Sequence, residues 1–129
     1  MEKLITAAQD LTGSWVNLGD AISVSDWNRV ALWLNVDIND SADVRFRALP
    51  LKTKTQDADQ YSYPIKYTSS SKVAIQDEIF ELSDDADQKI VVELETKGLV
   101  NALQFQVQAG TVGATPGQID EAEVSLSNY

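Results

Sequence analysis

Apolar and polar residues alternate along several stretches of this chain. Residues 29–38 read R-V-A-L-W-L-N-V-D-I, in which valine, leucine or isoleucine fills every second position. A repeat of two residues places one set of side chains on each face of an extended strand. Residues 103–109, L-Q-F-Q-V-Q-A, repeat the pattern, and their three glutamines are expected to face water. No segment has the 3.6-residue period of a helix, so we predict an antiparallel β protein.

Turn residues divide the chain into about eight to ten strands. We expect them among residues 4–8, 15–18, 22–24, 30–38, 43–49, 61–67, 73–75, 79–82, 89–96, 102–109 and 120–127. Short strands at this spacing are typical of a β-sandwich, and we predict a single jelly-roll domain over residues 1–129. Residues 30–38 and 43–49, separated by the turn N-D-S-A, are expected to pair as a hairpin with Arg45 or Arg47 beside Asp37.

Composition argues against an enzyme. The 129 residues include no cysteine and no histidine, which excludes disulfides, a serine or cysteine nucleophile paired with histidine, and the usual zinc sites. No two carboxylates stand at a signature spacing, so we expect neither catalysis nor a cofactor.

Two acidic clusters are candidates for calcium, which prefers oxygen ligands. Asp84, Asp85 and Asp87 form the spacing D-D-x-D, and Asn39, Asp40 and Asp43 form a second group. Neither has the glycine and distal glutamate of an EF-hand loop, so we interpret both as turns and expect no metal.

The formal net charge of −10 would repel phosphate backbones, so a nucleic-acid partner is not expected. Acidic residues concentrate between Asp77 and Glu95, where only Lys89 opposes them. This segment either meets a basic partner or stays solvated. No apolar stretch reaches membrane-spanning length and no secretory signal is evident, so a membrane partner is not expected either.

Aromatic residues are the candidate contact sites. Trp33 falls on the strand face opposite Val30, Leu32 and Leu34, so it must pack under another layer, a loop or a neighbouring chain, or else bind a ligand. We favour a contact between chains, with Trp33, Tyr61, Tyr63, Trp27 and Tyr129 as the predicted interface residues. The alternative is a sugar-stacking platform in which Gln104, Gln106 and Gln108 supply the polar partners.

Three stretches together resemble small virion structural proteins of tailed bacteriophages: residues 11–20 (L-T-G-S-W-V-N-L-G-D), 30–40 (V-A-L-W-L-N-V-D-I-N-D) and 103–119 (L-Q-F-Q-V-Q-A-G-T-V-G-A-T-P-G-Q-I). The resemblance implies a jelly roll made in the host cytoplasm and located in the virion. It further implies a capsid decoration protein that binds the major capsid protein or other virion proteins, and a homo-oligomer, with a trimer favoured. The alternatives are a carbohydrate-binding or host-receptor-binding module, and a tail or neck accessory protein.

Overall fold

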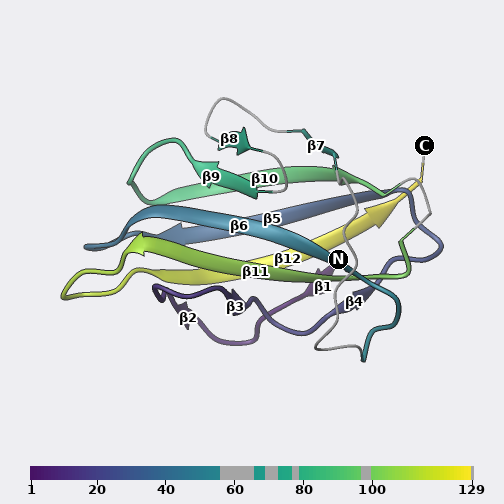
Figure 1. The fold of residues 1–129 in the computed structure, drawn as a ribbon, viewed down its shortest axis with the longest axis horizontal. Helices are drawn as coiled ribbons and strands as arrows, with labels where there is room; N and C mark the ends of the chain where they lie inside the picture. Colours follow the sequence, from purple (N-terminus) through teal and green to yellow (C-terminus); the bar gives the residue numbers. More distant parts are fainter. Residues whose placement is uncertain (56–65, 69–72, 77–78, 97–99, 129) are drawn as a thin grey trace.

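Two antiparallel β-sheets pack face to face in this protein (Figure 1). The computed structural model describes residues 1–55, 66–68, 73–76, 79–96 and 100–128. Twelve strands and no helix occur in this part of the chain, four of the strands being two-residue pairings. The predicted all-β sandwich is therefore confirmed. Over the same residues, there is no helix with the length and apolar character needed to cross a membrane.

Sheet A has the order β1-β12-β5-β10-β7, with β2 also paired to β12. Its strands are β1 (Glu2–Lys3), β2 (Gln9–Asp10), β5 (Arg29–Asp37), β7 (Lys66–Thr68), β10 (Gln88–Glu95) and β12 (Gln118–Ser127). Sheet B has the order β3-β11-β6-β9-β8, with β4 also paired to β11. Its strands are β3 (Val16–Asn17), β4 (Ile22–Ser23), β6 (Ala42–Leu51), β8 (Val73–Gln76), β9 (Ile79–Leu82) and β11 (Ala102–Thr111).

The strand pairs are nested along the sequence. Strand β5 pairs with β12, β6 with β11, β7 with β10 and β8 with β9, each pair enclosed by the one before it. Successive pairs alternate between sheet A and sheet B. Nested pairs that alternate between two sheets build a β-sandwich, which is the architecture that the number and spacing of the predicted strands indicated.

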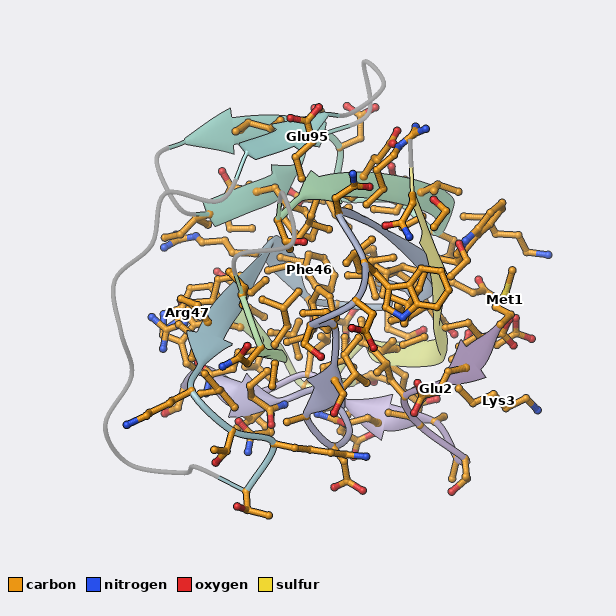
Figure 2. All side chains as sticks on the ribbon, turned by 90° about the vertical axis from the view of Figure 1, so that its right-hand side faces the viewer. Met1, Glu2, Lys3, Phe46, Arg47 and Glu95 are labelled. Atoms are coloured by element: carbon orange, nitrogen blue, oxygen red, sulfur yellow. The ribbon has the colours of Figure 1, made fainter. Side chains whose placement is uncertain are left out.

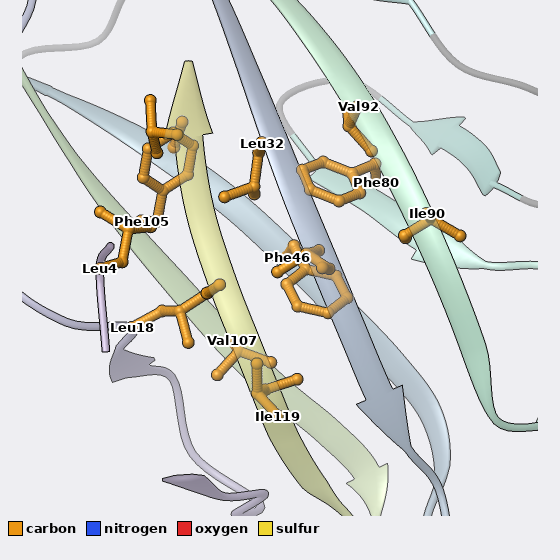
Figure 3. Packing of buried hydrophobic residues seen from close by; sticks show 14 of the residues in the cluster. Leu4, Leu18, Leu32, Phe46, Phe80, Ile90, Val92, Phe105, Val107 and Ile119 are labelled. Atoms are coloured by element: carbon orange, nitrogen blue, oxygen red, sulfur yellow. The ribbon is translucent and has the colours of Figure 1, made fainter. Parts of the chain in front are cut away.

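The inward residues of both sheets form one core. Phe46 on β6 and Phe80 on β9 stack with ring centroids 5.1 Å apart, and both are fully buried. Leu32, Ile90 and Val92 of sheet A pack against the same cluster (Figure 3). Figure 2 shows the alternation directly, because Phe46 lies between the sheets while its neighbour Arg47 lies at the outside.

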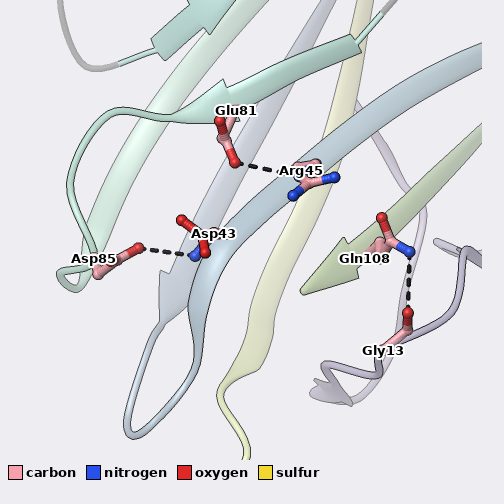
Figure 4. A network of polar contacts seen from close by, with 6 residues as sticks. All are labelled: Gly13, Asp43, Arg45, Glu81, Asp85 and Gln108. Atoms are coloured by element: carbon pink, nitrogen blue, oxygen red, sulfur yellow. Dashed lines mark hydrogen bonds and ion pairs between the residues drawn. The ribbon is translucent and has the colours of Figure 1, made fainter. Parts of the chain in front are cut away.

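The hairpin predicted for residues 30–49 is wrong. Strands β5 and β6 lie in different sheets, and the turn between them carries the chain across the sandwich. Asn39 and Asp43 take left-handed backbone angles in and just after this turn (φ of 48° and 54°), which asparagine and aspartate tolerate better than most residues. Because β9 and not β5 lies beside β6, Arg45 pairs with Glu81 at 3.2 Å (Figure 4).

The N-terminal segment also departs from expectation. Residues 4–8 do not form the predicted strand; β1 and β2 flank them, and Leu4 donates its amide to Ala122 O at 2.8 Å. Only one of the three glutamines of β11 is buried, although residues 13–19 run along the edge of that strand: Gln104 is buried, whereas Gln106 and Gln108 are partly exposed. Gln104 is 9% exposed and donates to Gly19 O, and Gln108 donates to Gly13 O (Figure 4).

Candidate interaction surface

Trp33 lies at the centre of the outer face of sheet A. The even-numbered residues Leu32 and Leu34 point into the core, so the period of two turns Trp33 outward, where it is 43% exposed. Pairing places Val91 of β10 on one side of Trp33 and Glu123 of β12 on the other. Val91 is itself 40% exposed, so two large apolar side chains share this part of the surface.

The indole of Trp33 lines a groove and is tied to a neighbouring strand. Its Nε1 donates a hydrogen bond to Ser125 Oγ at 3.0 Å, which ties the ring to β12. The groove has a volume of about 360 Å³, and Met1, Trp33 and Val91 supply much of its apolar lining. Its polar lining residues are Asn35, Lys89, Glu121 and Glu123. An apolar centre flanked by polar groups is typical of a protein contact surface.

Opposite charges lie on the two sides of β5, one row from Trp33. Asn35 pairs with Lys89 of β10 and with Glu121 of β12, so the three residues form one row across the sheet. Lys89 and Glu121 are both exposed, and neither forms an ion pair within the described residues. On the same face, Glu93 already forms an ion pair with Arg29. The row therefore offers one cation and one anion to a partner.

Trp27, a second predicted contact residue, does not line this groove. Trp27 is 38% exposed, but it lies in the turn before β5, where Thr96 Oγ1 donates to its carbonyl at 2.9 Å, and it does not line the groove. Tyr61, Tyr63 and Tyr129 lie outside the described residues. Of the two predicted interface residues that the structure describes, Trp33 lines the groove and Trp27 does not.

Trp15 is a poor platform for a ligand. The guanidinium carbon of Arg47 lies 4.3 Å from the centre of the indole ring, a cation–π contact that covers one face of it. Arg47 also donates from Nε to Gln106 Oε1 at 2.8 Å, and Gln106 donates to Asn17 Oδ1. Trp15 thus helps to fix the N-terminal segment against β6 and β11.

The two acidic clusters considered for calcium lie together at one end of the sandwich and bond to the backbone. Asp85 accepts from the amide of Asp43 at 2.9 Å (Figure 4), and Asp87 accepts from the amide of Ile38 at 2.8 Å. Among the described residues, no three acidic side chains are grouped so as to hold a metal ion. These carboxylates join the turn after β5 to the turn before β10.

One carboxyl group at this end has a perturbed pKa. Partial burial, followed by the charge of Asp87 and a hydrogen bond with it, raises the pKa of Asp37 above its ordinary value of 3.8, and the charge of Asp120 adds to the effect. Desolvation and neighbouring negative charge both disfavour the ionised form. The shift therefore reflects the crowding of Asp37, Asp87 and Asp120 at this end of the sandwich.

Sequence reasoning identified Trp33 but missed the residues around it. Val91 carried a signal, because a valine on the strand face opposite Ile90 and Val92 is an apolar residue at an outward position. The sequence carried no signal for Lys89 and Glu121, because only the order of strands in sheet A places them beside Asn35.

No family model, curated protein or solved structure matches this chain.

Proposed function

We propose that this protein is a structural component of a bacteriophage virion, a capsid decoration protein that acts through protein–protein contacts. The observation that supports it most is the exposed pair Trp33 and Val91 on the outer face of sheet A. Large apolar groups on a small acidic domain are costly to leave in water, and they gain free energy when a partner covers them. The partners proposed are the major capsid protein or other virion proteins, with a homo-oligomer as the binding unit.

A rigid jelly roll suits this role. Its core strands β5, β6, β11 and β12 span the length of the sandwich, and each is paired on both sides over at least part of that length. Such a domain changes shape little on binding and strengthens a shell by adding buried area between neighbouring subunits.

The test uses shells assembled from the major capsid protein encoded in the same genome. Purified chain is mixed with these shells and separated by gradient sedimentation, and the bound fraction is measured against concentration. The native chain should co-sediment at saturation. Trp33→Ala should weaken binding by about tenfold or more, because a tryptophan buried in the assembled particle, either against the shell or between the copies that form the binding unit, contributes roughly 2 kcal/mol.

Trp27→Ala is the matched control, since Trp27 is nearly as exposed but does not line the groove. It should leave binding within about twofold of the native value. Circular dichroism establishes that both variants are folded. Failure of the native chain to bind the shells would contradict the proposal.

A carbohydrate-binding or receptor-binding module is the second candidate. It draws on the same groove, in which an indole lies beside the amide of Asn35 and the carboxylates of Glu121 and Glu123. A sugar ring can stack on an aromatic face while its hydroxyls bond to such groups. Saturable binding on a glycan array that Trp33→Ala abolishes, without binding to shells, would favour this function over decoration. The same two measurements also bear on the third candidate, a tail or neck accessory protein. Such a protein should bind neither the shells nor the glycans.

A further inference from the structure

We propose that the partner seated on the Trp33 groove is a second copy of this chain, related by a two-fold axis that runs along β5. The proposal rests on the proposed assembly function and names the molecule that covers the groove. It follows from the charges in one row of sheet A, the row through Asn35, which are complementary to each other under that axis.

The row through Asn35 supplies the complementarity. Lys89 lies on one side of β5 and Glu121 lies on the other, in the same row. A two-fold axis along β5 exchanges the two sides and keeps the row unchanged. Lys89 of each copy therefore faces Glu121 of the other, which gives two ion pairs from one self-complementary surface.

The same axis places Trp33 over Trp33. The two indoles, each fixed by its bond to Ser125, meet at the centre of the contact, where aromatic residues contribute most. Sheets that pack face to face cross at about 30°, and the long side chain of Lys89 spans the resulting offset.

The axis along β5 is favoured over an axis across the strands. An axis across the strands through Trp33 would bring Lys89 over Glu93 of the other copy. Glu93 is already paired with Arg29, whereas Glu121 has no ion pair among the described residues. The axis along β5 therefore gives Glu121 an ion pair in the dimer, whereas in the monomer its carboxylate is exposed to solvent.

The area is sufficient for a modest dimer. The nine residues of β5 extend about 30 Å, and β1, β12, β5 and β10 together are about 20 Å wide. This gives roughly 600 Å² per copy, near the lower limit of a specific interface. We therefore expect a dimer that dissociates in the micromolar range and not an obligate one.

Charge reversal within one chain provides the test. Sedimentation velocity is recorded for the native chain and for Lys89→Glu, Glu121→Lys and the double variant, from about 1 µM to about 100 µM. The native chain should reach twice the monomer mass. Each single reversal places like charges opposite each other at two points and should raise the dissociation constant by about tenfold or more. The double variant restores both pairs and should return to within about threefold of the native constant.

Trp33→Ala should also give monomers, and Trp27→Ala should remain dimeric. A native chain that stays monomeric, forms the trimer expected from the resemblance, or dimerises without rescue in the double variant would overturn the proposal. The measurement contains no shells, so it is independent of the proposed function. If the chain dimerises but does not bind shells, the decoration function is contradicted and the dimer is not. If the chain stays monomeric but binds shells, the dimer is contradicted and decoration is not.

Discussion

Single carboxylates have different effects at the end of the sandwich where the turns meet. Asp85 and Asp87 accept hydrogen bonds from the backbone amides of Asp43 and Ile38, and so provide partners for these two donors. Asp37 is placed differently, because partial burial and the charges of Asp87 and Asp120 disfavour its ionised form. The crowding that lets two carboxylates bond to the turns thus destabilises a third.

Asp37→Asn should stabilise the protein near pH 7. The pKa of Asp37 is raised in the folded state, so ionised Asp37 lowers stability at every pH above that folded value. As the pH falls toward 3.8, the native carboxyl becomes protonated and the penalty is lost. The variant should therefore show a higher urea midpoint near pH 7 and lose this advantage below about pH 3.8.

Asp26→Asn, at an exposed turn position, is the matched control and should change the midpoint less. An equal gain from both variants near pH 7 would show that net charge, and not the neighbourhood of Asp37, causes the effect.

Loops at the same end are joined by one buried hydroxyl. Ser41, in the turn between β5 and β6, is 3% exposed. Its Oγ donates to Val112 O at 2.7 Å and accepts from the amide of Gly117 at 2.8 Å, and both partners belong to the connection between β11 and β12. This hydroxyl links the connection between β5 and β6 to the connection between β11 and β12, and both connections cross from one sheet to the other.

Ser41→Ala should lower the free energy of unfolding by about 1–3 kcal/mol, because it leaves a buried amide and a carbonyl without their partner. Chemical denaturation checks the value. Ser14→Ala, which removes a hydroxyl at an exposed position, should stay within about 0.5 kcal/mol of the native protein. Equal effects would mean that the hydroxyl of Ser41 is not a structural link.

Pairing between segments far apart in the sequence closes the molecule as a whole. Strand β5 pairs with β12 near the other end of the chain, and the amide of Asn28 donates to Asn128 Oδ1, 100 residues away. Each nested pair can form only after a long segment has been brought back on itself, which costs chain entropy before any contact compensates it.

We therefore expect slow folding, with relaxation times of about milliseconds to seconds in water. Stopped-flow refolding monitored by tryptophan fluorescence measures this directly. Relaxation in microseconds would contradict the nested topology, because local hairpins alone reach that speed.

The sequence determined which residues face inward. For β5, β10, β11 and β12 the alternation of side chains is a property of neighbouring residues, so the strands and the outward position of Trp33 were predictable from the chain alone. The class of fold followed from the number and spacing of those strands.

The tertiary structure decided which strands are neighbours. The order of strands places β5 and β6 in different sheets and residues 13–19 along the edge of β11. It also places Val91, Lys89 and Glu121 around Trp33. Pairing depends on how the whole chain closes, because any strand with one apolar face can bury it against many others. The inward face of each strand is therefore determined by local sequence, whereas the groove around Trp33 is assembled from three strands, β5, β10 and β12, that are distant in sequence.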